Sequence, residues 1–174
     1  MTGMRGMAAA GALGILAACG AAAGGEGSPR PRAFSQPIYD AAGQAVGQLT
    51  LTQQGRDSVR VTVESTRLPA GVHGTHLHTT GRCDPPGFTT AGGHLNPAAR
   101  QHGTRNPRGP HLGDLPNLTV SANGHGAINF LVSGEIADAD GTALVIHAKP
   151  DDYRTDPSGN SGDRIACAVL RPEH

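Results

Sequence analysis

A histidine-rich stretch between residues 71 and 114 constrains this chain more than any other feature, since it holds six of the nine histidines. His76 and His78 form a His-x-His pair in a segment, residues 72–79, where apolar and polar side chains alternate as in a β-strand. Residues i and i+2 of a strand project from one face with Cα atoms roughly 7 Å apart. The pair is therefore predicted to bind one metal ion. His73 points to the opposite face and is expected to be structural.

The second half of this stretch is predicted to be a metal-binding loop. Pairs such as Gly92-Gly93 and Asn96-Pro97 exclude a long helix or a regular strand. Long loops inside a compact domain are uncommon and usually functional. Three imidazoles and one carboxylate complete the ligand set of a tetrahedral zinc site. In this loop they belong to His94, His102, His111 and Asp114.

Length and composition favour one all-β domain. The chain has 174 residues, which is enough for one domain with a hydrophobic core. Its 26 glycines and 13 prolines predict short elements joined by turns, and the absence of tryptophan predicts a core of aliphatic side chains. Because 14 basic residues balance 14 acidic ones, nothing points to nucleic acid as a partner.

Alternating apolar and polar residues predict seven or eight short strands, as in a β-sandwich or barrel. Residues 59–64 alternate strictly and direct three valines inward. Residues 123–126, Asn-Gly-His-Gly, mark a hairpin turn. The expected strands are residues 36–39, 45–53, 59–64, 72–79, 118–122, 127–132, 143–147 and 165–170.

The chain before the globular domain is expected to export and tether it. Residues 1–18 end in an apolar run too short to span a bilayer as a permanent helix. This run closes on Leu-Ala-Ala-Cys, which resembles the bacterial lipobox, so Cys19 is expected to receive a lipid after cleavage. An ordinary secretory signal, or an alanine-rich leader with an incidental cysteine, is the alternative. Residues 19–33 are expected to be a flexible tether and residues 34–174 the globular domain.

The cysteine count agrees with export. If Cys19 carries a lipid, Cys83 and Cys167 remain as an even pair. In an oxidising compartment such a pair is expected to form a disulfide rather than two unrelated thiols. The bridge would connect the metal loop to the last strand. Closing a loop of that length stabilises the fold by about 4 to 5 kcal/mol in the chain-entropy model, less any strain.

Five motifs, in order and at consistent spacing, resemble the copper,zinc superoxide dismutases. They are GVHGTHLH from Gly71, AGGHLNP from Ala91, HG from His102, HLGDLPN from His111 and GNSGDRIAC from Gly159. The resemblance covers about residues 36–171. It implies an eight-stranded Greek-key β-barrel of the immunoglobulin-like sandwich type, with a long metal-binding loop and a shorter electrostatic loop.

The resemblance implies one copper and one zinc per chain. Copper is assigned to His76, His78, His94 and His147, and zinc to His94, His102, His111 and Asp114. By the same resemblance, His94 is an imidazolate that bridges both ions. Asp151 matches a carboxylate that hydrogen-bonds one ligand histidine at each metal, and Arg164 matches the guanidinium beside the open copper position. Cys83 and Cys167 match the intrachain disulfide.

The activity implied by the resemblance is the dismutation of superoxide to dioxygen and hydrogen peroxide. Four imidazoles suit copper, which cycles between Cu(II) and Cu(I), whereas three histidines and one aspartate suit zinc, which does not. His94 is expected to supply a proton as well as a ligand, and Arg164 to attract the superoxide anion. The enzyme is expected to protect the bacterial cell envelope from its periplasmic side, as a monomer or homodimer that meets the membrane only through a lipid on Cys19.

Three features depart from the family pattern. Thr75 replaces an aromatic residue, Asp163 directly precedes Arg164, and the loop at residues 149–163 is short, which predicts weaker steering of superoxide. The alternative function is a non-catalytic envelope protein of the same fold that binds copper and zinc. A copper-delivery protein is disfavoured because the sequence has no Cys-x-x-Cys motif or methionine cluster.

Overall fold

The computed structural model describes residues 3, 33–136 and 139–170. The expected leader at residues 1–18, the proposed lipidation site Cys19 and the expected tether therefore lie outside the described residues, apart from Gly3 and Ala33. In the described part of the chain, no helix has the length and apolar character needed to cross a bilayer.

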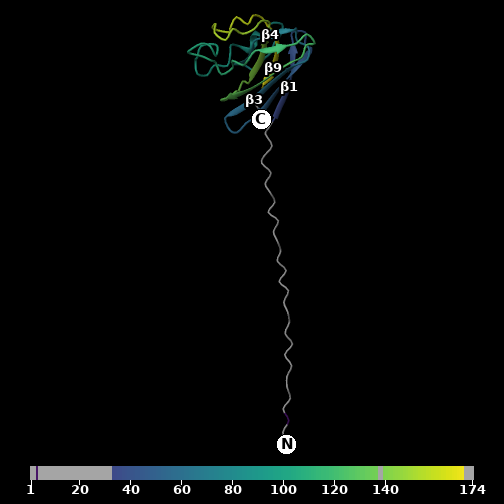
Figure 1. Ribbon diagram of the computed structural model, residues 1–174, viewed down its shortest axis with the longest axis vertical. Helices are drawn as coiled ribbons and strands as arrows, with labels where there is room; N and C mark the ends of the chain where they lie inside the picture. Colours follow the sequence, from purple (N-terminus) through teal and green to yellow (C-terminus); the bar gives the residue numbers. More distant parts are fainter. Residues whose placement is uncertain (1–2, 4–32, 137–138, 171–174) are drawn as a thin grey trace. The chain divides into compact units, whose positions relative to one another are not determined.

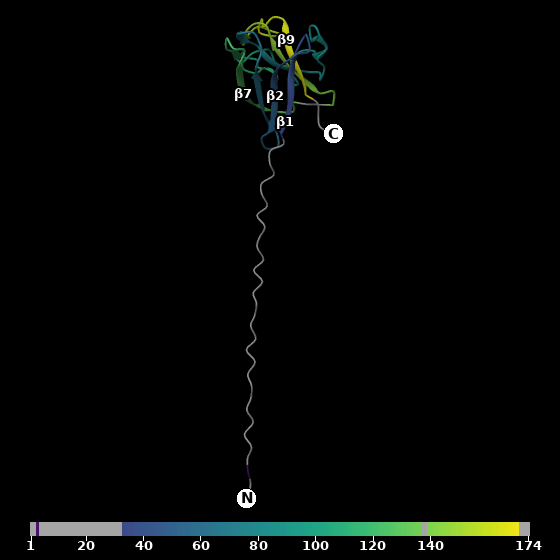
Figure 2. The same cartoon turned by 90° about the vertical axis from the view of Figure 1, so that its right-hand side faces the viewer.

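The described domain is built almost wholly from antiparallel strands (Figures 1 and 2). The large sheet has the order β5-β8-β9-β1-β2-β3-β7, and β4 pairs with β6 in a second, small sheet. The strands are β1 (Ala33–Asp40), β2 (Ala45–Gln53), β3 (Ser58–Ser65), β4 (Gly71–His73), β5 (Thr75–His78), β6 (Leu118–Val120), β7 (Gly126–Ser133), β8 (Thr142–His147) and β9 (Arg164–Leu170). A short 3-10 turn, η1 (Thr89–Ala91), lies in the loop after β5.

The two sheets join at both edges of the large sheet. β4 runs into edge strand β5 through Gly74, and β6 runs into the other edge strand, β7, through a turn closed by the Ser121 N–H and the His125 carbonyl oxygen (2.9 Å). The small sheet thus closes the large one into a barrel. With β4 and β5 counted as one interrupted strand, the described barrel has eight strands. The predicted all-β Greek-key barrel is confirmed.

Gly74 divides the strand that the sequence predicts over residues 72–79. Its N–H donates to the Lys149 carbonyl oxygen (2.8 Å), and its own carbonyl oxygen accepts from the His147 N–H (2.9 Å). A Cβ atom at this position would lie 2.8 Å from the Cβ atom of Ser161, which explains why glycine is needed. The single-strand expectation is therefore wrong: the chain leaves β6 at Gly74 and pairs with β8 beyond it.

The core is aliphatic, as the composition predicts. Val61 and Val63 are fully buried on the inner face of β3. β8 is buried at every position, because Leu144 and Ile146 pack into the main core while Ala143 packs with Phe88 in a second cluster. Burial of each large aliphatic side chain contributes roughly 1.5–3 kcal/mol. The second cluster holds the loop after β5 against β8 and β9.

A disulfide reinforces that attachment. Cys83, in the loop after β5, is bonded to Cys167 on β9, with the two Cα atoms 5.8 Å apart. Cys167 belongs to the same second cluster as Phe88, and Cys83 packs against it. The predicted disulfide is confirmed.

Candidate metal centre

Seven side chains from β5, β8 and the loop between β5 and β6 gather in one buried region. They are His76, His78, His94, His102, His111, Asp114 and His147, each nine-tenths or more buried. Backbone pairing explains how the loop reaches the strand. The Leu77 N–H donates to the Gly113 carbonyl oxygen (2.9 Å), and the Leu77 carbonyl oxygen accepts from the Leu95 N–H (2.8 Å). The loop therefore runs along the edge of β5 that does not pair with β8, with Asp114 opposite His76 and His94 opposite His78.

The first group consists of the four histidines that the resemblance assigns to copper. His76, His78, His94 and His147 offer ligand atoms within 4.8 Å of one another. Each ring also has one buried nitrogen without a hydrogen-bond partner in the described chain: His76 Nδ1, and Nε2 of His78, His94 and His147. Because each buried unpaired polar atom costs about 1–3 kcal/mol, four of them meeting in one place fit a metal ion better than a packed core.

The opposite nitrogens of these rings are held by the surrounding loops. His78 Nδ1 donates to the Gly92 carbonyl oxygen (2.9 Å), and His147 Nδ1 donates to the Gly162 carbonyl oxygen (3.0 Å). His76 Nε2 donates to Asp151 Oδ2 (2.9 Å). A ring that donates from one nitrogen keeps a lone pair on the other, so these bonds leave the inward nitrogens ready to coordinate.

Burial keeps these imidazoles neutral. Desolvation lowers the pKa of His76 to about 3, of His78 to about 2 and of His147 to about 4. Burial also lowers the pKa of His94. A metal that binds this group at pH 7 therefore displaces no proton from His76, His78 or His147.

The second group surrounds one oxygen of Asp114. Its Oδ1 atom lies 2.9 Å from His94 Nδ1, 3.0 Å from His102 Nδ1 and 3.2 Å from His111 Nδ1. The other oxygen, Oδ2, accepts hydrogen bonds from the Gly103 N–H (2.8 Å) and the His111 N–H (2.9 Å), which fixes the carboxylate. Three nitrogens and one oxygen facing a common point match a tetrahedral zinc site.

His76 also offers an atom within 4.8 Å of His94, His102 and Asp114. We nevertheless place His111 in the second group. His76 uses Nε2 to bond Asp151 and directs Nδ1 to the first group, whereas His111 Nδ1 lies 3.3 Å from His94 Nδ1. His94 is thus the ring shared by both groups.

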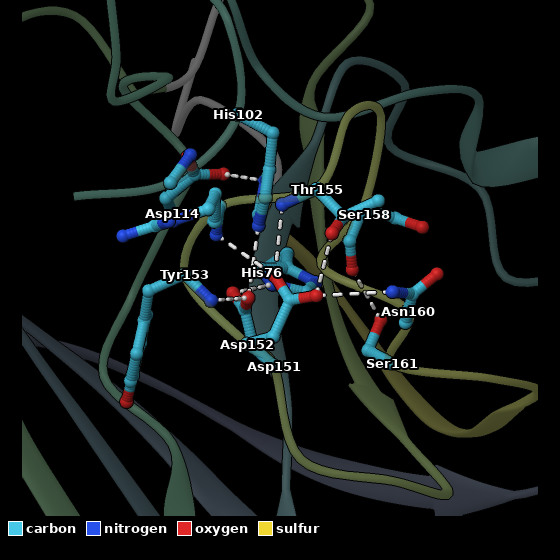
Figure 3. A network of polar contacts seen from close by, with 12 residues as sticks. His76, His102, Asp114, Asp151, Asp152, Tyr153, Thr155, Ser158, Asn160 and Ser161 are labelled. Carbon is cyan, nitrogen blue, oxygen red and sulfur yellow. Dashed lines mark hydrogen bonds and ion pairs between the residues drawn. The ribbon is translucent and has the colours of Figure 1, made fainter. Parts of the chain in front are cut away.

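Asp151 forms a second connection between the groups (Figure 3). Its Oδ2 accepts from His76 Nε2 and its Oδ1 from His102 Nε2, each at 2.9 Å. Although burial raises the pKa of this carboxyl group, hydrogen bonds from His102, His76 and the Tyr153 N–H hold it well below its usual range. At His102 the balance is similar. Burial alone lowers the pKa of this imidazole, but the Asp114 and Asp151 carboxylates outweigh the effect of burial and raise the pKa to about 9.

Asn117 and Gly159 lie against Asp151, and no sequence pattern indicates this placement. The Asn117 side chain donates to the Asp151 carbonyl oxygen and accepts from the Asp151 N–H, both at 2.9 Å. Gly159 passes so close that a Cβ atom would collide with Asp151 Oδ1 and His102 Nε2. Its φ of +64° also favours glycine. Both residues lie within the quoted motifs, but their spacing carried no sign of this role.

Arg164 lies beside the first group. As the first residue of β9 it pairs with His147 on β8, and its charge contributes to the lowered pKa values of His78 and His147. Its Nη1 donates to the Phe88 carbonyl oxygen (2.8 Å) and its Nη2 to the Gly92 carbonyl oxygen (2.7 Å). The loop after β5, which the disulfide attaches to β9, therefore orients this guanidinium.

The sequence pattern of the copper/zinc superoxide dismutases (SODC) matches residues 45–170. The chain belongs to the copper/zinc superoxide dismutase family. Superoxide dismutase [Cu-Zn] 1 of Aquifex aeolicus is 39% identical over 144 residues, which cover 77% of this chain and 85% of that protein. Superoxide dismutase [Cu-Zn] of Caulobacter vibrioides is 37% identical over 74% of this chain and 80% of its own.

Solved structures agree with the family assignment. A SOD-like protein from Bacillus subtilis has a TM-score of 0.73 and 36% identity, over 78% of this chain and 97% of its own. The Cu/Zn superoxide dismutase from Brucella abortus has a TM-score of 0.66 and 28% identity, over 80% of this chain and all of its own (100%). Membership of the superoxide dismutase family confirms the predicted enzyme class and the predicted cofactors, copper and zinc.

His73 lies outside both groups. It is buried, with Nδ1 2.7 Å from the His147 carbonyl oxygen and Nε2 2.9 Å from the Pro69 carbonyl oxygen. These contacts join the loop before β4 to the end of β8, which fits a structural residue.

Two of the residues that depart from the family pattern are Thr75 and Asp163. The buried Thr75 hydroxyl donates to the His73 carbonyl oxygen (3.3 Å), while Asp163 is exposed.

Proposed function

We propose that this protein dismutates superoxide at a copper ion bridged to a zinc ion by His94. The proposed copper ligands are His76, His78, His94 and His147, and the proposed zinc ligands are His94, His102, His111 and Asp114. The observation that carries the proposal is the set of four unpaired, buried nitrogens that meet beside Arg164. When bound, copper supplies reversible one-electron transfer and zinc supplies positive charge without redox chemistry.

His94 is the residue placed to move a proton. Its Nδ1 faces Asp114 and the second group, while its Nε2 is buried and unpaired in the first group. A proton taken up at Nε2 can pass directly to an oxygen anion held beside it.

Arg164 is proposed to attract and orient superoxide. Two of its N–H donors are taken by the Phe88 and Gly92 carbonyl oxygens. A guanidinium has five N–H donors, so three remain for a small anion. Burial lowers the pKa of Arg164, yet an arginine stays charged at physiological pH.

We further propose that the enzyme works on the periplasmic side of the bacterial cell envelope and protects it from superoxide. Residues 1–18 would direct export, Cys19 would carry the lipid anchor, and residues 34–174 would form the active domain. The Cys83–Cys167 disulfide supports an oxidising compartment. Unchanged sensitivity to externally generated superoxide after deletion would contradict this protective role.

The test of the proposed activity uses residues 33–174 loaded with both metals. We expect rapid dismutation with about one copper and one zinc per chain. The His76→Ala variant is expected to lose copper and turnover while keeping zinc. Full metal occupancy without turnover would instead support the alternative, a non-catalytic metal-binding protein of the same fold.

A further inference from the structure

In most of the proposed ligand histidines, the ring nitrogen that faces away from the metal groups donates a hydrogen bond. His76, His78, His102 and His147 each donate from the nitrogen that faces away from the metal groups. His94 directs both of its nitrogens toward the metal groups. His111 is left, with Nδ1 toward Asp114 and Nε2 on the far side of its ring.

His111 Nε2 faces Asp156, a residue with no part in the ligand set. Asp156 Oδ1 lies 3.9 Å from His111 Nε2, and the Asp156 side chain is 44% exposed. The same oxygen accepts a hydrogen bond from the His102 N–H at 2.5 Å. Asp156 therefore touches two of the residues proposed to bind zinc, and it does so from the loop that also carries Asp151.

We propose that Asp156 is a positioning residue for the zinc site, acting on His111 as Asp151 acts on His102. An outer carboxylate that accepts a hydrogen bond from the Nε2–H of a ligand histidine fixes the tautomer, orients the ring and makes Nδ1 a stronger ligand. The 3.9 Å separation is longer than a hydrogen bond, so the two groups must approach by about 1 Å to form one. This inference rests on the zinc ligands proposed above.

The backbone contact with His102 offers a competing role, in which Asp156 only fastens its own loop to the zinc loop. Two substitutions separate these roles. Asp156→Asn keeps an oxygen that can accept from the His102 N–H but removes the negative charge beside His111. Asp156→Ala removes both. A role in fastening alone predicts a defect in Asp156→Ala and none in Asp156→Asn.

The experiment measures zinc release from the mature, metal-loaded protein to a chelator. It also records the visible absorption of cobalt(II) placed in the zinc site, which reports ligand geometry. Outer-sphere substitutions typically weaken metal affinity 10–100-fold. For Asp156→Asn we therefore expect about tenfold faster zinc release or more, an altered cobalt spectrum, and copper affinity within about twofold of the parent.

Asp163→Asn is the matched control, because it removes one negative charge from the same loop at an exposed position. It is expected to release zinc at the parental rate. Parental zinc release and cobalt spectrum in Asp156→Asn would overturn the inference, whatever Asp156→Ala does. His111→Ala distinguishes failure of the inference about Asp156 from failure of the proposed zinc ligands. If it releases zinc rapidly while Asp156→Asn does not, this inference alone fails, and if it too retains zinc normally, the proposed zinc ligands fail as well.

Discussion

Arg164 and His147 are paired across β8 and β9, which places the guanidinium next to a proposed copper ligand. The pairing comes from the register of the barrel itself. The carbonyl oxygens of Phe88 and Gly92, in the loop after β5, then fix the direction of the side chain. Since the Gly92 carbonyl oxygen also accepts a hydrogen bond from His78, one carbonyl oxygen aligns Arg164 and the proposed copper ligand His78.

Replacing Arg164 by alanine is expected to lower the dismutation rate about tenfold or more without removing either metal, because an attracting charge next to the reaction site is lost. The dismutation rate of Arg164→Lys should lie between the rates of the parent and of Arg164→Ala. The dismutation rate of the parent should fall as ionic strength rises, and the rate of the alanine variant should fall less. Rates measured across a salt series, with metal content determined on each sample, check this expectation. Equal salt dependence in the parent and Arg164→Ala would contradict it.

Replacing Asp151 by alanine is expected to weaken both metal sites together. The carboxylate orients His76 on one side and His102 on the other, and outer ligands of this kind are worth about 10–100-fold in metal affinity. Chelator competition for copper and zinc on the same protein gives the measurement. Asp152→Ala is the neighbouring control, since its contacts are with its own loop and leave the ligand histidines untouched. A loss confined to one metal would argue against the double role of Asp151.

The raised pKa of His102 predicts opposite effects of pH on the metal-free protein and on zinc binding. Because this pKa rises from 6.5 to about 9, the protonated ring stabilises the metal-free fold below pH 6.5, and the contribution is lost as pH rises through about 9. Zinc must displace that proton, so zinc affinity is expected to rise about tenfold per pH unit between pH 7 and 9. Isothermal titration in several buffers would report the released proton, and pH-independent zinc binding over this interval would contradict the prediction.

Removing the disulfide is expected to reduce both stability and turnover. The bridge joins residues separated by 84 positions, and loss of such a crosslink typically costs about 2–5 kcal/mol. It also fixes the loop whose carbonyl oxygens hold Arg164. The Cys83→Ser, Cys167→Ser double variant should unfold at lower denaturant concentration and dismutate more slowly at full copper occupancy. Unchanged turnover per copper would show that the loop holds Arg164 without the bridge.

The sequence predicts the parts of the site that depend on short-range geometry. His76 and His78 could be paired because a strand places alternate residues on one face, and both lie in β5 with their rings in the same group. The proposed zinc ligands could be grouped because glycine and proline exclude regular structure between them. His147, Asp151 and Arg164 were assigned only by resemblance, since their positions depend on the long-range pairing of β8 with β5 and β9.

Other features were not predictable from residue patterns. Gly74 interrupts a convincing strand because its backbone bonds to residues 147 and 149, far along the chain. Asn117 and Asp156 act through hydrogen bonds to loops more than 30 positions away, which no local signal encodes. Gly159 matters through the Cβ atom that it lacks, a role that becomes visible only when Asp151 and His102 are in place.

The proposed function is tested most directly by stopped-flow absorbance of superoxide decay, with protein that carries zinc and graded amounts of copper. If the four buried histidines hold the reacting copper, the catalytic rate should increase in proportion to copper content and vanish in the zinc-only protein. Full copper occupancy at this site without any acceleration over the uncatalysed decay would contradict the proposed function.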